Sequence, residues 1–510
     1  MRKAACWLTV IAVISKILGF FRELVMSYYY GAGELTDIFQ MSSSAGNVFL
    51  GWMLTLAIIH TPIYQEIKVK KNEKSAKNFS NQIILIELII SVLVMTIILG
   101  AKTKIISFIA KGFTNSQILI TSDFFFWSSL SIVFSGLSQI IISELNCDNK
   151  IIRANVSNLL VSTMQIVVIF FAAQQDDFRL IKFALPISTG IQFLFLVVAM
   201  NKKNRTTNVL LFSDELKKFF VLIVPVFVSA MMDEINAFVD KSFGSELIHG
   251  SISGLNYAHL LKQLCFYVFT TAVITLLYPQ ISKQVAEKNF KRTAENSQIA
   301  IDYMIFVFSY LMCFVCFFSF TIVKFVYKRG SFDDADVLIT AQCLIMYSTA
   351  LLPLAVREVL VRVFQAYQDT KTNMNIAIIS TAINIILNIV LVRYLKHMGL
   401  ALSTSLAAYA TVPILLYLLK KRNNYFDLRY IYKNIVKGIV AAIIACFTSR
   451  VVLHSFCIQD NNTISCFAIL LIAFILSVIL YCLILKLLKI KVTISFLTKD
   501  NSNENDEYSK

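Results

Sequence analysis

The sequence predicts an all-α polytopic membrane protein, and three observations support this fold class. Hydrophobic residues make up 57% of the 510 residues and charged residues only 15%, which is more apolar surface than a soluble domain can bury. Only 6 Pro and 15 Gly interrupt the chain, so long helices fit better than many short strands. The apolar runs are continuous rather than alternating, which argues against a membrane β-barrel.

About fourteen apolar segments are long enough to cross a bilayer as helices. The first starts like a signal peptide, but Lys16 interrupts it and the hydrophobic run then resumes, so we expect a retained first helix. The first, seventh and tenth segments contain several charged residues, so hydropathy supports them least. In order, the segments centre on residues 5–30, 38–65, 82–100, 119–145, 152–173, 180–200, 217–243, 253–281, 297–325, 335–367, 372–393, 398–419, 434–455 and 463–488.

The chain contains an internal repeat. "HTPIYQEI" and "LYPQISKQ" place Pro62 and Pro279 at similar ends of similar segments. An even number of segments separates the two copies, so both run in the same direction and form parallel repeats, an arrangement that occurs in two-lobed transporters. We expect an N-lobe at 1–205, a C-lobe at 206–422, two further helices within 423–490, and a polar cytoplasmic tail at 491–510.

The net charge of +16 is concentrated in short loops between the apolar segments. The Lys- and Arg-rich loops, 68–78, 201–205, 283–292 and 420–429, all fall on one side, which predicts that both termini face the cytoplasm. These loops also favour anionic membrane lipid as a partner. No aromatic and basic stretch is long enough for a nucleic-acid site. Because no catalytic or nucleotide-binding motif is present either, we expect a transporter rather than an enzyme, driven by the membrane potential or a cation gradient.

Several charged residues lie inside the apolar segments. In "SKILGFFREL" (15–24), Lys16 and Glu23 share one helical stripe, and Arg22 is adjacent to Glu23. His259 and Lys262 add positive charge to the eighth segment, and the seventh contains Asp233, Glu234, Asp240 and Lys241. Such groups are costly in lipid unless they face water or a partner. They therefore predict a polar cavity that holds an anionic substrate, or else ion pairs that join neighbouring helices.

A second set of polar residues occurs in the last two segments of the repeat. Asn384 and Asn388 lie one turn apart, and Thr404 lies one turn after Leu400. With Asp240 as the charged ligand, their carboxylate, amide, hydroxyl and carbonyl oxygens suit a hard cation such as Na⁺. The alternative is that these side chains only form hydrogen bonds between helices.

Three stretches resemble one family of transporters. They are "SKILGFFRELVMSYYYGAGELTDIF" (15–39), "RVFQAYQDTKT" (362–372) and "LKHMGLALSTSLAAY" (395–409). Together they resemble the MurJ/MviN family of lipid II flippases, within the multidrug/oligosaccharidyl-lipid/polysaccharide exporter superfamily. The similarity runs through nearly the whole chain.

This resemblance implies a two-lobed flippase with alternating access. It would move an undecaprenyl-pyrophosphate-linked peptidoglycan precursor from the inner to the outer leaflet of the bacterial cytoplasmic membrane, as a monomer or together with cell-wall synthesis proteins. Lys16 and Arg22 match basic positions of the family's first helix, and Asp37 matches the acidic start of its second. Asp240, Asn384, Asn388, Thr404 and the carbonyl of Leu400 match a Na⁺ site of the family. The helices within 423–490 match a groove for the lipid tail.

The sequence departs from the family at two positions. "SAGNVFLGW" (44–52) lacks the Arg that the family usually has early in its second helix. "YAHLLKQL" (257–264) has Leu260 in place of an Arg, with His259 and Lys262 as the nearby basic residues. Two alternatives therefore stay open: a flippase for another polyprenyl-linked saccharide, such as an exopolysaccharide precursor, and a drug/cation antiporter of the same superfamily, which would favour an acidic cavity.

Overall fold

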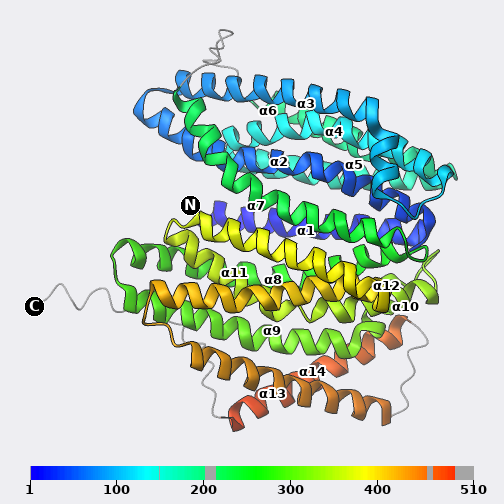
Figure 1. The fold of residues 1–510 in the computed structure, drawn as a ribbon, viewed down its shortest axis with the longest axis vertical. Helices are drawn as coiled ribbons and strands as arrows, with labels where there is room; N and C mark the ends of the chain where they lie inside the picture. Colours follow the sequence, from blue (N-terminus) through cyan, green and yellow to red (C-terminus); the bar gives the residue numbers. More distant parts are fainter. Residues whose placement is uncertain (1, 149, 201–213, 456–462, 489–510) are drawn as a thin grey trace, which may run out of the picture. The chain divides into compact units, whose positions relative to one another are not determined.

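The computed structural model describes residues 2–148, 150–200, 214–455 and 463–488, and this part of the chain is helical with no strand (Figure 1). The all-α fold class is confirmed. The helices are α1 (Arg2–Tyr30), α2 (Glu34–Lys70), α3 (Glu73–Ile109), α4 (Asn115–Cys147), α5 (Ile151–Gln174), the short 3₁₀ helix η1 (Phe178–Phe183), α6 (Ala184–Ala199), α7 (Asp214–Gly244), α8 (Ser251–Ala286), α9 (Phe290–Tyr327), α10 (Asp334–Ser348), α11 (Leu351–Ala366), α12 (Thr370–Arg422), α13 (Leu428–Ser455) and α14 (Thr463–Leu487).

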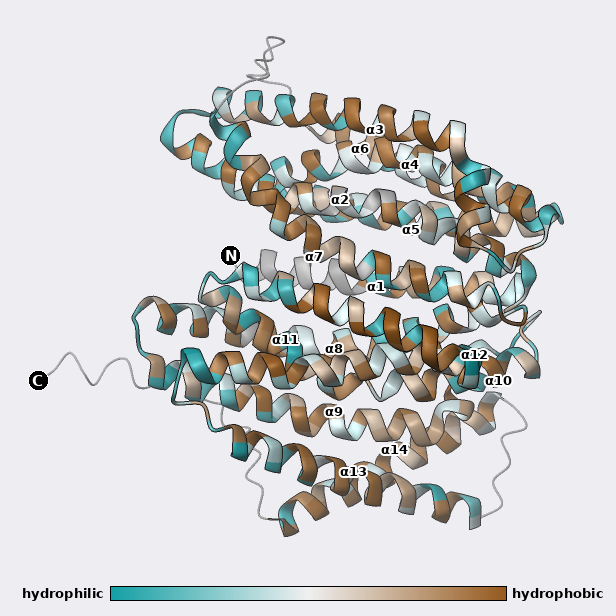
Figure 2. Ribbon diagram, in the orientation of Figure 1, coloured by the Kyte–Doolittle hydropathy of each residue, from teal (hydrophilic) through white to brown (hydrophobic). Residues whose placement is uncertain are grey.

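Most of these helices have the length and composition of membrane spans. Among the described residues, 9 helices are long and apolar enough to cross a membrane, or 10 if the bent pair α10 and α11 is one span. Two predicted segments lie within α12, which is interrupted at Lys396, where φ is 49° and ψ is −130°. The helices are therefore compatible with the predicted spans, whose number stays a prediction. Figure 2 shows hydrophobic residues along the helices and hydrophilic residues mainly near their ends.

The chain divides into two compact units. The first consists of residues 1–261, 323–344 and 370–407, and the second of residues 262–322, 345–369 and 408–510. The first unit combines residues from both predicted lobes, whereas the second contains part of the predicted C-lobe and the residues after position 422. The predicted domain boundaries stay a prediction. Among the candidate site residues, Lys262 belongs to the second unit, and all the others belong to the first.

The first unit has α2 in its hydrophobic core. Buried side chains of α2, α3, α4 and α7, such as Ile63, Phe79, Ile140 and Phe219, pack together there. His60 of α2 is fully buried in this core, and its two ring nitrogens lie 2.8 Å from Ser143 Oγ and 2.9 Å from Ser80 Oγ. Both polar atoms of the imidazole are satisfied, so a structural role accounts for His60.

Local sequence explains where several helices begin. The Asn72 side chain accepts a hydrogen bond from Ser75 N at the start of α3, and Thr114 and Gln117 form a capping box at the start of α4. The turn between α1 and α2 requires glycine at position 31, because φ there is +63° and a Cβ atom would lie 2.6 Å from the backbone oxygen of Ser331.

In the second unit, α9, α13 and α14 pack together. Tyr310 Oη of α9 lies 2.9 Å from Ser477 Oγ of α14, and Tyr481 Oη donates to the backbone oxygen of Phe306 at 2.8 Å. These contacts join helices that are distant in sequence by hydrogen bonds between otherwise apolar surfaces. On α11, Arg362 forms an ion pair with Glu358, four residues earlier, at 2.8 Å.

Candidate functional site

Arg22 lies in the middle of a hydrogen-bonded cluster on α1. Its guanidinium donates through Nε to Glu23 Oε1 at 3.1 Å and also through Nη2, and it donates through Nη1 to Gln165 Oε1 of α5 at 2.6 Å. These contacts occupy three of the five guanidinium N–H groups, which leaves two for a ligand. The side chain of Arg22 is 30% exposed, so it is partly accessible even though its partner Glu23 is buried.

Glu23 connects this cluster to other helices. Its second oxygen, Oε2, accepts hydrogen bonds from Gln40 Nε2 of α2 at 3.3 Å and from Asn256 Nδ2 of α8 at 3.4 Å. Lys241 of α7 donates to the backbone and side-chain oxygens of Gln40, at 3.3 and 3.4 Å. The charges of α1 are therefore joined to α2, α5, α7 and α8 through polar contacts. This arrangement satisfies charged groups that would otherwise be costly inside apolar helices.

Asp37 is almost fully buried near the start of α2, and its carboxylate caps α8. Its two oxygens accept hydrogen bonds from the backbone N–H of Gly250 and from the backbone N–H of Ser253, both at 2.7 Å, and from Ser253 Oγ at 2.8 Å. The first N–H groups of a helix have no partner inside the helix, and they favour a negative charge. The predicted role of Asp37 in substrate binding stays a prediction, since in this structure its oxygens hold α8.

The remaining predicted substrate ligands lie in different surroundings. Lys16 is exposed on α1, two turns before Glu23, and His259 is half-buried on α8. Lys262 is 4% exposed, and its ammonium lies 5.0 Å from the centroid of the Tyr347 ring, within its own compact unit. The structure thus brings two of the predicted substrate ligands, Arg22 and Glu23, into direct contact.

All five predicted cation ligands lie together in the first unit. Asn388 Nδ2 donates to Asp240 Oδ1 at 2.6 Å and to Asn384 Oδ1 at 2.9 Å. Thr404 Oγ1 lies 3.4 Å from both Asp240 Oδ2 and the backbone oxygen of Leu400. Asp240, Asn384, Asn388 and Leu400 are buried. The set brings together carboxylate, amide, hydroxyl and carbonyl oxygens, which fits a hard cation such as Na⁺.

Two neighbours of this set were missed by sequence reasoning. Ser403 donates to Asn388 Oδ1 and to the backbone oxygen of Leu400. Asn384 has an alternative amide orientation, which replaces the hydrogen bond from Asn388 and in which Asn384 donates to Asn236 Oδ1 at 2.7 Å. Asn236 lies one turn before Asp240 on α7, so helical spacing from the acidic ligand is the signal that could have identified it.

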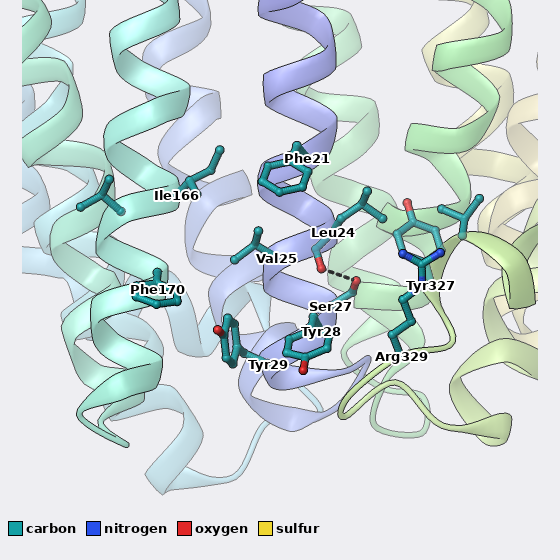
Figure 3. Close-up of a pocket in the computed structure, with 12 residues that line it drawn as sticks. Phe21, Leu24, Val25, Ser27, Tyr28, Tyr29, Ile166, Phe170, Tyr327 and Arg329 are labelled. Carbon is teal, nitrogen blue, oxygen red and sulfur yellow. Dashed lines mark hydrogen bonds between the residues drawn. The ribbon is translucent and has the colours of Figure 1, made fainter. Parts of the chain in front are cut away.

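An apolar groove follows α1 from the Arg22 cluster to the C-terminal end of the helix (Figure 3). Its volume is about 440 Å³, and it lies between α1, α5 and the end of α9. Phe21 and Tyr28 of α1 and Phe170 of α5 line it, and the guanidinium of Arg329 adds a positive charge. Phe21 and Ile166 are the chain neighbours of Arg22 and Gln165, so the polar contact and the groove share the same pair of helices.

Long apolar helices with a satisfied cluster of charges in their interior define a polytopic membrane transporter. The chain belongs to the family described as lipid II flippase MurJ, whose family model matches residues 26–473. It is 26% identical over 470 residues to a probable lipid II flippase MurJ of Buchnera aphidicola, covering 89% of this chain and 91% of that one. A probable lipid II flippase MurJ of Rickettsia prowazekii is 25% identical over 425 residues, covering 80% of this chain and 82% of that one.

Solved structures share the fold. A lipid II flippase MurJ in an inward closed conformation superposes with a TM-score of 0.79 at 23% identity, covering 95% of this chain and all of the other. An inward-facing multidrug resistance transporter of the MATE family has a TM-score of 0.69 at 13% identity, covering 82% of this chain and 98% of the other. At these identities the two structures establish the architecture alone.

Proposed function

We propose that this protein is a flippase that carries lipid II, a peptidoglycan precursor linked to a polyprenyl pyrophosphate, from the inner to the outer leaflet of the bacterial cytoplasmic membrane. Membership of the family and the similarity to two curated flippases support the substrate class. The Arg22 cluster is the structural observation that carries the proposal, because it places a partly accessible guanidinium inside the apolar helices. Both termini would face the cytoplasm, where the basic loops would contact anionic lipid.

Arg22 would bind the pyrophosphate. A guanidinium forms paired, charge-assisted hydrogen bonds with phosphate oxygens, and two of its N–H groups are not used by Glu23 and Gln165. Glu23 holds the guanidinium in place before the substrate arrives. Lys16, on the same helix and exposed, supplies a second positive charge that would attract the headgroup. The protein would perform no covalent chemistry, since binding and a change between two access states are sufficient for flipping.

Na⁺ would bind at the Asp240 set. A cation there would neutralise a buried carboxylate that also accepts hydrogen bonds from Asn388 and Thr404. Because Asp240 is on α7 and the other ligands are on α12, bound Na⁺ would favour the arrangement in which these helices are close. A Na⁺ gradient or the membrane potential would then bias the direction of transport.

The polyprenyl tail would stay in contact with apolar surfaces during transport. The helices within 423–490 are the proposed tail groove, and the groove between α1 and α5 offers a second apolar surface beside Arg22. The charged headgroup would then cross the membrane through a polar interior, and the tail would remain in an apolar environment. This avoids the free-energy cost of placing the charges in lipid or the tail in water.

A second candidate is a flippase for another polyprenyl-linked saccharide. The missing basic residue in 44–52 and the Leu at position 260 favour it, because fewer cations would face the headgroup. The cation at Arg22 argues against a drug/cation antiporter, which would favour an acidic cavity.

Complementation tests the main proposal. The wild-type chain and Arg22→Ala would be expressed in a bacterium depleted of its own lipid II flippase, with Arg179→Ala as a matched control, because Arg179 is exposed. We expect the wild type and the control to restore growth and Arg22→Ala to fail while inserting normally. A well-inserted wild type that fails to rescue would exclude lipid II and favour the second candidate. Rescue by Arg22→Ala would exclude Arg22 as the pyrophosphate ligand.

A further inference from the structure

A polar cavity of about 330 Å³ lies inside the first unit, apart from the apolar groove. Residues of α2, α4, α5, α6 and α7 line it. Its polar lining includes Asn47, Gln139, Asn158, Ser162, Gln192 and Glu234. A cavity lined by so many amides and hydroxyls is unusual among apolar helices, because each polar group in such a place is costly unless it meets water, a partner or a ligand.

Part of this lining has hydrogen-bonding capacity to spare. Within the described part of the chain, the side chains of Asn47, Gln139 and Ser162 form no hydrogen bond. By contrast, Gln192 Nε2 donates to Asn158 Oδ1 at 2.9 Å, which holds the amide of Asn158 in one orientation. The cavity thus combines an oriented amide pair with polar groups that can still accept a ligand.

The chemistry of the lining indicates a neutral, hydroxyl-rich ligand. Amides and hydroxyls both donate and accept hydrogen bonds, as the hydroxyl and acetamido groups of a sugar do. Glu234 also lines the cavity, and its carboxylate oxygens are acceptors for hydroxyl groups. The amides and hydroxyls of the lining therefore suit a saccharide.

The cavity also lies in the right place relative to Arg22. Asn158, Ser162 and Gln165 follow one another on one face of α5, at spacings of four and three residues. Gln165 accepts the hydrogen bond from Arg22 at 2.6 Å. The rise of an α-helix places Ser162 about 4.5 Å along the axis from Gln165. Arg22 is therefore linked through Gln165 to the face of α5 that carries two residues of the cavity lining.

We propose that this cavity is the saccharide subsite of the transporter, which binds the sugar attached to the pyrophosphate. The inference rests on the proposed function and deepens it, since it assigns recognition of the glycan to neutral residues of α2, α4, α5 and α6 rather than to the cations. It also gives the protein a means to distinguish a loaded carrier lipid from a bare one.

Binding measurements on the full-length purified chain test this assignment. The probes are lipid II and undecaprenyl pyrophosphate, which lacks the sugar. The variants are Gln139→Leu, which removes an amide from the cavity, and Gln175→Leu as a matched control, because Gln175 is exposed just beyond α5. Losing one hydrogen bond should weaken binding of lipid II by about tenfold in Gln139→Leu. Binding of undecaprenyl pyrophosphate should be unchanged in both variants.

A second variant covers the case in which one amide contributes little. Ser162→Phe fills the cavity with a ring, so it should abolish the preference of the protein for lipid II over undecaprenyl pyrophosphate. If both cavity variants bind lipid II as tightly as the wild type, the saccharide subsite is wrong although the proposed function stands. If the wild type binds neither probe, the proposed function fails and the subsite with it. Equal weakening of both probes by Ser162→Phe would also overturn the subsite.

Discussion

Replacing Asp37 with Asn should release the N-terminal end of α8 from α2. The buried carboxylate accepts three hydrogen bonds from Gly250 and Ser253 at 2.7 to 2.8 Å. An Asn side chain has the same shape but presents one oxygen and one NH₂ group, so at least one backbone N–H loses its acceptor and faces a donor. The negative charge at the helix N-terminus is lost as well.

The size of this effect follows from the contacts. A hydrogen bond to a charged group contributes about 1.5–3 kcal/mol, and a charge near a helix terminus contributes about 0.3–1 kcal/mol. Losing one such bond and the charge should cost about 2–4 kcal/mol, with little discount for solvent because Asp37 is only 3% exposed. At about 1.4 kcal/mol for each factor of ten, the local opening of α8 should become about 30- to 700-fold more frequent.

Hydrogen–deuterium exchange measures this opening directly, since the amides of Gly250 and Ser253 exchange when the contact with Asp37 breaks. The variant would be compared with the wild type and with Glu34→Gln, a matched control because Glu34 is exposed in the first turn of the same helix. We expect faster exchange around the start of α8 in Asp37→Asn than in the wild type. In the control, Glu34→Gln, the exchange rates there should equal those of the wild type. Equal protection in both variants would refute the reasoning that this carboxylate holds α8.

Three further predictions concern the cation site, a tight packing contact and an ion pair. Asp240→Asn should abolish any rise in melting temperature on adding Na⁺, and an unchanged Na⁺ response would exclude this site. Gly112→Ala should lower the melting temperature by several degrees, because the added Cβ atom would lie 2.1 Å from the backbone oxygen of Ser245. An unchanged melting temperature would show that the segments around Gly112 and Ser245 separate readily. The hydrogen bond from Lys218 lowers the pKa of Glu66 from 4.5 to about 2. The stabilising contribution of the Glu66 carboxylate is therefore complete above pH 4.5 and is lost as the pH falls toward 2. The melting temperatures of the wild type and Glu66→Gln should converge in acid, and a difference that stays constant with pH would contradict this.

Much of the cation site could be predicted from the sequence, because its geometry is partly local. Asn384 and Asn388 lie one helical turn apart, and this spacing alone places both amides on one face of α12. Their contact with Asp240, at 2.6 Å from Asn388, joins residues that are 148 positions apart. Spacing could not predict that contact. The chemistry of a hard-cation site and the family resemblance were the grounds for placing Asp240 with the two amides. The sequence does not identify Ser403, because a Ser hydroxyl in a helix can bond the backbone of its own helix, and only the fold shows that it also meets Asn388.

The contacts of the Arg22 cluster could be predicted only in part. The adjacency of Arg22 and Glu23 is visible in the sequence, but the contact with Gln165 depends on how α1 packs on α5. A neutral Gln within an apolar helix has no signal of its own. In the same way, the family resemblance identified Asp37 as an acidic residue at the start of the second helix and predicted it as a substrate ligand. Packing directs it instead to the end of α8.

The pairing of Arg22 with Glu23 resolves a difficulty that every transporter of anions faces. A cation that binds phosphate inside the membrane must also be stable when the substrate is absent, because an unpaired charge there is costly. Glu23 supplies a permanent partner, and Gln40 and Asn256 hold its second oxygen, so the carboxylate does not have to leave when the substrate arrives. In the proposed binding mode, the phosphate would need only the two remaining N–H groups of Arg22. Its binding would be moderate rather than maximal, which suits a protein that must release its substrate on the other side of the membrane.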